Sequence, residues 1–455
     1  MKNRNKYLVA VSLAIIVMGL WNCTKHDQVL DLTTTIPAAT SGVGDTLMAL
    51  HVGAVPTLLA QSTPGGSAAT LWNGTIDAAW NNAKKLTVHA TVPDLGVGTF
   101  TGYVGNSTDI TMRSMYDGTY INFLVEFDAA QKNVKSAQWY FNPTQTDKTK
   151  RWAQEATVPA LNADGVTFRP PAAQDQLVIM FNVANSCKTF NALSCYAACH
   201  AYSPYGTATP AASGVMYTNG PTEILDVWRA RMLQVMNTNQ ANDCFIDDGT
   251  SALSAGTLNK NEVHNDWQIH NGPTATQHPT TQVADGGLSN KQSIKITGMN
   301  TKATVPLWAI PNASTSTYAN YSAIMPSDTL PTTGKALKVM KVDSFGVLTL
   351  SDNSIIDPRI GTAYQQIGAG DGAKSIPGSI VDAYTGSRGD VTVNAFHTGT
   401  GWRILLQRKL STTDADGYDV DFKNQTNMPF GIGAMFNGAD NEHAIVAGLT
   451  LHFQK

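Results

Sequence analysis

Short runs of alternating apolar and polar residues, at both ends of the 455-residue chain, constrain its fold most strongly. Leu86–Val92 alternates in this way. Asp109–Tyr116 and Thr119–Phe127 flank Asp117-Gly118, the strongest short signal for a hairpin turn. The unbroken apolar run Gln176–Val183 predicts a strand that is buried on both faces. Further strands are expected at Val391–Phe396, Trp402–Leu410, Phe430–Phe436 and Ile445–Phe453.

These strands predict a mainly β fold, an antiparallel immunoglobulin-like β-sandwich with a few short helices. Residues 248–370 are polar and weakly patterned, so we expect a loop-rich insertion there. Ser293–Ile296 and Leu337–Val342 are its candidate strands. Helical spacing predicts a helix through Ile224, Leu225, Trp228, Met232 and Val235.

The N-terminus is typical of an export signal. Lys2, Arg4 and Lys6 precede the apolar run Leu8–Leu20, which is too short to span a membrane. The run ends in Leu20-Trp21-Asn22-Cys23, similar to a bacterial lipobox although Asn22 replaces the usual Gly or Ala. We therefore expect a signal peptide over residues 1–22 and a lipidated Cys23, the alternative being an ordinary cleaved signal.

The segment after the signal is rich in Thr, Ala, Ser, Gly and Pro. Residues 23–70 are predicted to be a lipidated tether, partly ordered near Leu47–Leu59, and residues 71–455 to form the sandwich domain. Either export signal places the chain in an oxidising compartment of the cell envelope. With a net charge of −3 and only 14% charged residues, nothing indicates a nucleic-acid partner.

The central chemical motif is Cys195-Tyr196-Ala197-Ala198-Cys199-His200. A c-type haem needs two thiols for thioether bonds to the porphyrin and a histidine beside the second cysteine to bind iron. Three residues separate the cysteines here, where two are common. A local Cys195–Cys199 disulfide remains an alternative, and two cysteines with one histidine fall short of a closed zinc site. Cys187 and Cys244 are the remaining cysteines, and we expect them to form a disulfide in an oxidising compartment.

Beyond this motif, the chain resembles the haem-binding domain of the ethylbenzene dehydrogenase gamma-subunit family, also described as the cytochrome c-552/DMSO reductase-like haem-binding domain. The three-residue spacing occurs among the c-type members of that family. Matching pieces stand in order along most of the chain: Ile76–Trp80, Ser114–Ile121, Gln174–Leu177, Asp226–Ala230, Asn242-Asp243, Ile376–Gly378, Ser387–Val391, Gly401–Ile404, Gln407–Leu410, Asp419–Phe422 and Met435–Asn437.

The resemblance implies a β-sandwich that holds a haem at one end and transfers electrons, commonly with a molybdenum enzyme in anaerobic respiration. The lipobox and the long insertion depart from that pattern. In the family a methionine at the first hairpin can be the sixth iron ligand, and Met115 stands at the matching place. Met115 as core filling is the alternative. His443 and His397 are other candidates for the sixth ligand.

Several large side chains are open to two interpretations. Trp80, Trp228 and Trp402 are expected in the core, because large rings fill sandwich interiors. Arg388 and Arg408 match the geometry of haem propionates, but we favour structural salt bridges with Asp390 or Asp419.

The leading interpretation is an exported monohaem c-type cytochrome, held at the outer membrane by its lipid and facing the periplasm or the exterior. Its partner would be a molybdenum oxidoreductase or another cytochrome. A ligand-binding, carbohydrate-binding-like sandwich with disulfides and no haem is the alternative. An enzyme with an open iron site ranks third, and no nucleophile elbow, paired-carboxylate signature or phosphate loop is convincing.

Overall fold

The computed structural model describes most of the chain between residues 45 and 455. Residues 160–161, 168–169, 192–193, 195–196 and 264–265 are described by their backbone alone. The described ranges are 45–92, 105–155, 160–161, 168–169, 174–198, 218, 220, 222–248, 264–265, 288–311, 323–360, 376–412, 417–436 and 443–455.

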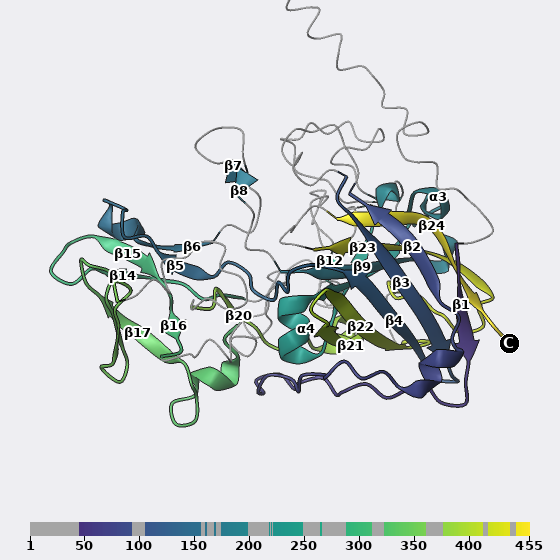
Figure 1. The fold of residues 1–455 in the computed structure, drawn as a ribbon, viewed down its shortest axis with the longest axis horizontal. Helices are drawn as coiled ribbons and strands as arrows, with labels where there is room; N and C mark the ends of the chain where they lie inside the picture. The colour runs from purple at the N-terminus through teal and green to yellow at the C-terminus, as the bar shows by residue number, and fades with distance from the viewer. Residues whose placement is uncertain are drawn as a thin grey trace, which may run out of the picture.

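A 12-stranded sheet dominates the structure (Figure 1). Strand β2 (Leu86–Thr91) lies off the main path and pairs with both β24 and β3. Along the sheet the strands follow the order β12 (His264–Asn265), β11 (Asn242–Ile246), β10 (Leu225–Arg231), β9 (Gln176–Asn182), β23 (Asn427–Met435), β24 (Ala444–Phe453), β1 (Thr46–His51), β3 (Ser107–Tyr116), β4 (Tyr120–Asp128), β22 (Gly401–Lys409) and β21 (Thr392–His397).

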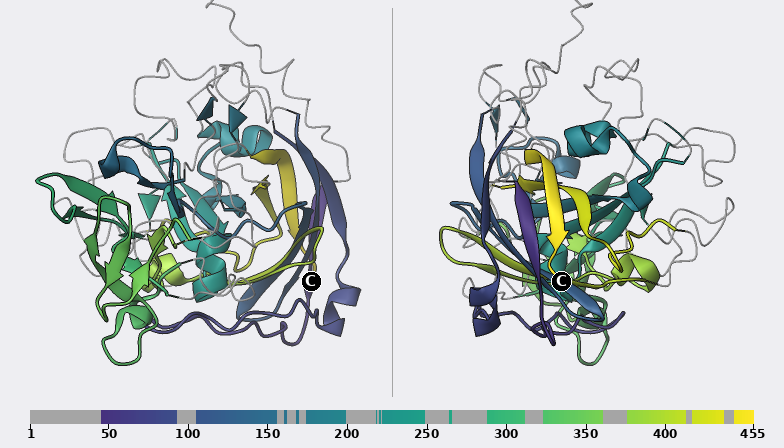
Figure 2. Two further views of the ribbon diagram at one scale, coloured as in Figure 1. Left: turned by 60° about the vertical axis from the view of Figure 1, so that its left-hand side comes forward. Right: turned by 90° about the vertical axis from the view of Figure 1, so that its right-hand side faces the viewer.

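The sheet curls over on itself, so that its two halves face each other across one core. The ring of Phe123 in β4 lies 6.2 Å from that of Phe181 in β9 and 5.9 Å from that of Trp228 in β10. We call β9–β12, β23 and β24 layer one, and β3, β4, β21 and β22 layer two. The curvature is visible when the molecule is turned (Figure 2). The predicted sandwich is thus confirmed, without its immunoglobulin-like detail.

Most predicted strands are present. The hairpin β3–β4 turns at Asp117, whose Oδ1 accepts hydrogen bonds from the amides of Thr119 (2.7 Å) and Tyr120 (2.8 Å). These bonds hold the chain reversal that the Asp-Gly pair predicted. Strands β2, β9, β21, β22, β23 and β24 fall where alternation or continuous apolarity placed them.

The predicted tether contains strand β1, in the part where some order was expected. Strand β1 runs parallel to both neighbours, β24 and β3, and closes the sheet between the layers. Leu47 and Ala49 are fully buried in the core. The order expected near Leu47–Leu59 is therefore present over residues 46–51, where two apolar side chains on one face form a short strand. The chain then passes the 3₁₀ helix η1 (Ala78–Asn82).

The predicted helix is half right. Leu225 and Trp228 lie in β10, and only Met232 and Val235 lie in a helix, α4 (Met232–Thr238). Strand β10 is buried on both faces, so apolar residues occupy adjacent positions and imitate helical spacing. The helix ends at Asn239, which adopts the left-handed conformation (φ 54°) and donates its amide to the carbonyl of Val235 at 2.9 Å.

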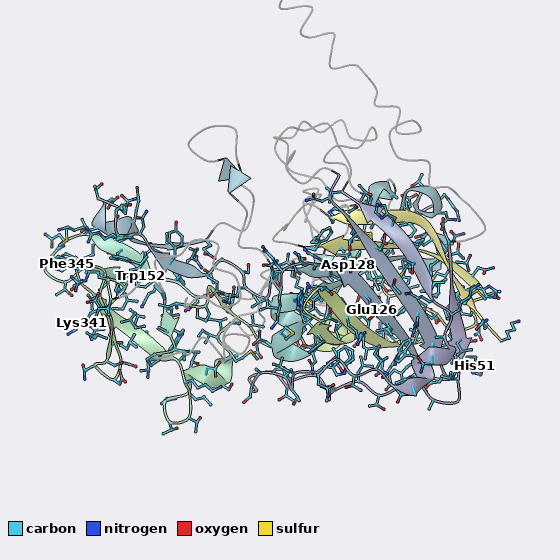
Figure 3. The ribbon with its side chains drawn as sticks, viewed as in Figure 1. His51, Glu126, Asp128, Trp152, Lys341 and Phe345 are labelled. Atoms are coloured by element: carbon cyan, nitrogen blue, oxygen red, sulfur yellow. The ribbon has the colours of Figure 1, made fainter. Side chains whose placement is uncertain are left out.

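Much of the predicted insertion forms a second lobe with its own hydrophobic core (Figure 1). Both strands expected there are present, at Gln292–Lys295 and Leu337–Val342. Trp152, from outside the insertion, also belongs to this lobe and donates Nε1–H to the carbonyl of Gly346 at 2.7 Å (Figure 3). The strands of this lobe are β5 (Trp139–Phe141), β6 (Trp152–Gln154), β13 (Leu288–Ser289), β14 (Gln292–Lys295), β15 (Lys302–Val305), β16 (Trp308–Ala309), β17 (Leu337–Val342), β18 (Leu348–Leu350), β19 (Ile355–Ile356) and β20 (Ser379–Ile380).

Short elements complete the described chain. Within it, no helix is long and apolar enough to cross a membrane. The remaining elements are β7 (Ala160–Leu161), β8 (Phe168–Arg169), η2 (Lys148–Lys150), η3 (Val183–Asn185), α3 (Phe190–Leu193), η4 (Ser194–Ala197), η7 (Pro326–Thr329) and η8 (Gly386–Gly389).

Candidate functional site

The first part of the Cys-x-x-x-Cys-His motif lies on the outer face of layer one. Residues 190–197 form α3 and η4, and Ala197 and Ala198 are buried there. Cys199, His200 and the side chain of Cys195 lie outside the described part of the structure. The buried residues beneath and within this segment, called the outer cluster, are Met180, Cys187, Phe190, Ala197, Ala198, Leu225, Val227, Cys244 and Ile246.

A glycine lets the motif segment approach the sheet closely. A Cβ on Gly431 of β23 would lie 2.8 Å from Cβ of Ser194, so any side chain at position 431 would collide with η4. Ser194 Oγ also accepts a hydrogen bond from the amide of Gly448 in β24, at 3.3 Å. These two contacts fix where the motif begins on the sheet.

Beside this anchor runs a strip of the outer face with little side-chain bulk. Gly433 lies two residues beyond Gly431 on the same face of β23, and pairs with Val178 of β9 and Ile445 of β24. Val178 and Ile445 are only half-buried. The strip thus has an apolar floor with a glycine at its centre.

His443 stands at the far side of that strip. It precedes Ala444, which pairs with Ala434, so His443 lies opposite Met435 on the outer face. Its Cδ2 is 3.6 Å from the position that a Cβ of Gly433 would occupy, so the imidazole leans over the glycine. The sequence indicated His443 as a sixth-ligand candidate, and the structure brings it to the outer face on which residues 190–198 lie.

Met115 lies on the opposite outer face, that of layer two. Its side chain is fully buried among Leu58, Trp80, Leu124 and Leu405. Both layers of the sheet and the sandwich core between them separate it from Ala197 and Ala198. This placement agrees with the core-filling interpretation of Met115 and gives no support to its role as a ligand.

His397 also lies away from the motif segment. It ends β21, where its Nε2 is 3.0 Å from the carbonyl oxygen of Ala129. Its ring meets that of Trp402 edge-on, with centroids 5.1 Å apart. The contacts place His397 at the margin of the sandwich core.

Cys187 and Cys244 are both buried in the outer cluster, but no disulfide joins them in the described part of the structure. Cys187 Sγ lies 3.5 Å from Thr189 Oγ1, and Cys244 Sγ donates to the carbonyl of Asn242 at 3.6 Å. The structure therefore does not contain the predicted disulfide, and the two sulfurs have separate local contacts. Burial raises the pKa of the Cys187 thiol.

The predicted core tryptophans and arginines are also placed. Trp80, Trp228 and Trp402 are all buried, as expected. Arg388 is fully buried, donates Nε–H to Asn242 Oδ1 at 2.7 Å, and stacks over the Tyr384 ring at 4.1 Å. Burial of this guanidinium favours a structural role over contact with haem propionates.

Arg408 is the centre of a buried charge cluster that sequence reasoning foresaw only in part. Its Nη1 lies 2.7 Å from Asp226 Oδ2, 3.7 Å from Asp243 Oδ2 and 3.9 Å from Asp419 Oδ1. Asp419 was the expected partner, whereas Asp226 makes the short contact. In the sequence, Asp226 and Asp243 were noted only within the pieces that match the family. The spacing of apolar residues does not show that β10 and β11 pair and bring these two carboxylates together.

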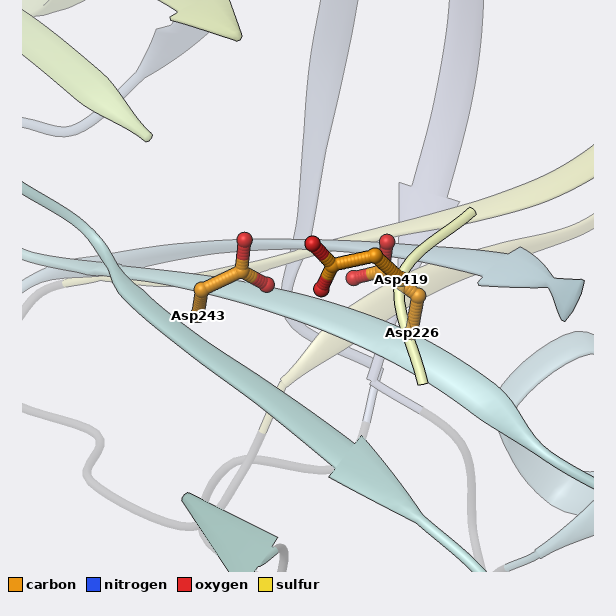
Figure 4. Close-up of side chains that lie close together, drawn as sticks. All are labelled: Asp226, Asp243 and Asp419. Carbon is orange, nitrogen blue, oxygen red and sulfur yellow. The ribbon is translucent and has the colours of Figure 1, made fainter. Parts of the chain in front are cut away.

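The three carboxylates turn toward one another (Figure 4), and their oxygens lie within 4.8 Å, as metal ligands would. The guanidinium already supplies a cation among them, so a metal is not required. Burial raises the pKa of Asp226 to about 6, against the lowering effect of Arg408 and with a further rise from Asp419. The cluster therefore favours a proton on Asp226 in mildly acidic solution.

Comparison with known proteins gives a family and a weak structural likeness. No curated protein matches the chain. Two structures of a family 9 carbohydrate-binding module from Caldicellulosiruptor kristjanssonii match at 7% identity: the cellotriose complex (TM-score 0.23, covering 90% of this chain and 93% of the other) and the glucose complex (TM-score 0.22, 89% and 95%). The family model described as ethylbenzene dehydrogenase matches residues 77–446, which is most of the chain. The chain therefore belongs to the ethylbenzene dehydrogenase family, associated with a multi-subunit redox enzyme complex.

Proposed function

We propose that this chain is an exported monohaem c-type cytochrome that carries electrons to or from a respiratory redox partner. The motif Cys195-x-x-x-Cys199-His200 carries the proposal. In it, each thiol would add across one porphyrin vinyl group, forming a thioether without a leaving group, and His200 would bind the iron. Membership of a redox-complex family supports the electron-transfer role.

The described residues fit such a group. The segment that leads into the motif is seated firmly on the sheet through Ser194 and Gly431. Beside it lies the half-buried apolar strip of Val178, Gly433 and Ile445, which carries no side chain at its glycine. An apolar, partly covered surface beside the attachment point suits a flat, largely apolar ring.

When bound, the haem would supply one-electron chemistry, and this chain would set its orientation and exposure. Anchoring η4 on β23 and β24 would fix the attachment point relative to the sheet. The apolar strip would keep water from one edge of the ring. A dry edge disfavours the charged state of the iron and so tunes its potential.

Location and partner belong to the same proposal. An N-terminal lipid at Cys23 would hold the protein at the outer membrane, facing the periplasm or the exterior. Only residues 24–45 separate that cysteine from β1, a reach of roughly 75 Å at full extension. The sandwich would then act close to the membrane, with a molybdenum oxidoreductase or another cytochrome as its redox partner.

The test is to mature the full chain in a host with haem-attachment machinery and to weigh it. We expect the mass of one haem beyond polypeptide and lipid, and reduced absorption bands that survive acid-acetone extraction. Cys195→Ala with Cys199→Ala is the matched control and should lose the covalent haem. A wild-type mass that polypeptide and lipid explain completely would sink the proposal and favour a ligand-binding sandwich.

A further inference from the structure

We propose that the second lobe binds the surface of a membrane that contains anionic phospholipids. It does so through its lysine face, the side of β14, β15 and β17–β19 that is turned away from the core of the lobe. The proposal goes beyond the proposed function and does not depend on the haem. Residues 288–360 hold seven lysines and arginines against four aspartates and no glutamate, whereas the net charge of the whole chain is −3.

Three lysines form a row across neighbouring strands of this face. Lys295 of β14 and Lys302 of β15 pair directly across their hairpin. Ile296, the next residue of β14, bridges to Val342 of β17 in parallel, and both of these side chains are buried. Because side chains alternate along a strand, Lys295 and Lys341, each one residue earlier, lie side by side on the opposite, exposed face.

The row continues onto exposed apolar side chains. Lys341 pairs with Thr349 of β18, and Thr349 pairs with Ile355 of β19, so the three share one face. Ile355 is 62% exposed, and Met340, the neighbour of Lys341 in β17, is 53% exposed. Lys341 and the exposed Phe345 both lie at the end of the lobe that is far from the sandwich (Figure 3). The lysine face thus combines positive charge with large apolar side chains that are more than half open to solvent.

The lysines of the row have no counter-charge among the described residues. Asp357, an acidic residue of the same lobe, pairs with Arg359 at 2.7 Å instead. Lys295 and Lys302 face each other across the hairpin, and like charges in directly opposite positions destabilise a strand pair. An anionic surface laid over the row would remove this repulsion and supply the missing negative charge.

The kind of side chain favours a lipid surface over an acidic protein. Protein interfaces are depleted in lysine and enriched in arginine, whereas the row consists of lysine alone. Each lysine held near an anionic leaflet strengthens binding about fivefold. Apolar side chains such as Met340 and Ile355 add to the binding by entering the headgroup region. The lipid proposed at Cys23 would already hold the chain close to such a surface.

The experiment uses residues 23–455 with Cys23→Ser, because an attached lipid or an uncleaved signal would itself hold the chain on a bilayer. Co-sedimentation compares vesicles of mixed phosphatidylglycerol and phosphatidylcholine with vesicles of phosphatidylcholine alone. We expect binding to the anionic vesicles only. This binding should be lost when the ionic strength rises from about 0.1 M to about 1 M, since the Debye length falls from about 10 Å to about 3 Å.

A triple variant tests the row itself. Lys295→Gln, Lys302→Gln and Lys341→Gln together should weaken vesicle binding about 100-fold, at about fivefold for each lysine. The fold should be retained, because the substitutions remove a repulsion between facing strands, and thermal unfolding checks this. The matched control neutralises three exposed lysines of the sandwich, Lys84, Lys85 and Lys409. It should bind as the wild type does.

Three results would overturn the proposal: equal binding by the triple variant and the control, equally strong binding to neutral vesicles, and no binding of the wild type to any vesicle. If the wild type bound polyglutamate but no vesicle, and the triple variant bound neither, the lysine face would belong to an acidic protein instead. None of these results bears on the covalent haem, so the mass measurement decides the proposed function separately.

Discussion

The two outer faces of the sandwich are built from the same kind of strand but are used in opposite ways. The face of layer two is covered by the protein's own large side chains, with Trp80 and Met115 buried against Leu124 and Leu405. The face of layer one carries Gly431 and Gly433 beside the motif segment. One face is filled by packing, and the other keeps a strip in which Gly431 and Gly433 carry no side chain.

The difference teaches where a cofactor could be accommodated. A fully packed face offers no space without a loss of stability, because protein interiors are close-packed. A strip floored by glycine and half-buried apolar residues loses little when it is covered. Experiments that separate stability from haem spectroscopy can therefore tell the two faces apart.

The largest effect is expected from the charge cluster that lies between the layers. Arg408→Met leaves Asp226, Asp243 and Asp419 buried without their cation and should lower the free energy of unfolding by about 3–5 kcal/mol. Chemical denaturation of the full chain measures this. Arg403→Met is the matched control, since Arg403 pairs at 2.7 Å with Glu126, which lies on the partly exposed face of layer two and is labelled in Figure 3.

The control should cost no more than about 1 kcal/mol, because exposed ion pairs contribute little. Equal losses in the two variants would show that burial does not distinguish the charge cluster from the surface pair. If Arg408→Met also changed the spectrum of the proposed haem, the inside of the sandwich would be coupled to the outer face of layer one.

Met115→Ala tests the packed face. Truncating a fully buried methionine leaves a cavity and should lower the free energy of unfolding by about 2–5 kcal/mol. The spectrum of the proposed haem should not change, because Met115 lies on the other face of the sandwich. Denaturation and absorption spectroscopy on the same sample measure both quantities. Little loss of stability together with an altered spectrum would reverse the roles that the structure gives to the two faces.

The sequence predicted much of this fold because its strongest signals are local. Alternation in β4 and the Asp117 turn need only neighbouring residues. The misplaced helix arose in β10, where burial on both faces removes alternation. The buried cluster of Asp226, Arg408 and Asp419 could not be located, because pairing between distant strands decides which charges meet.

The candidate site, too, has a part that local sequence shows and a part that depends on the pairing of distant strands. The motif from Cys195 to His200 is contiguous and could be read directly. The face on which it lies depends on the register that sets Gly431 beneath Ser194. Met115 and His443 could not be ranked by position in the chain, since each is distant from the motif in sequence and only strand order separates their faces.

A change in pH should have a smaller and more gradual effect on the free energy of unfolding. The pKa of Asp226 is raised to about 6 in the folded protein, above the value near 3.9 expected when unfolded. The folded state therefore binds the extra proton, and this stabilisation, present in full below about pH 4, is lost as the pH rises through about 6. We expect a loss of at most about 3 kcal/mol from this group.

Asp226→Asn removes the titration while keeping the shape of the side chain. Its free energy of unfolding relative to wild type should therefore rise between pH 4 and pH 7. Denaturation series at several pH values measure the difference. A difference that stays flat with pH would mean that Arg408 keeps Asp226 ionised throughout, and the cluster would then be a permanent ion pair.

The smallest effects separate two glycines on one strand. Gly431→Ala places a Cβ 2.8 Å from that of Ser194 and should cost about 1–3 kcal/mol by overpacking η4 against β23. Gly433→Ala meets its nearest atom, Ile445 Cγ2, at 3.3 Å and should cost less than about 1 kcal/mol. If the proposed haem rests on this strip, Gly433→Ala should nevertheless perturb its spectrum, since the new methyl group enters the strip. If neither alanine altered the spectrum, the strip would not be the place where the haem binds. The two outer faces would then not differ in their capacity to hold a cofactor.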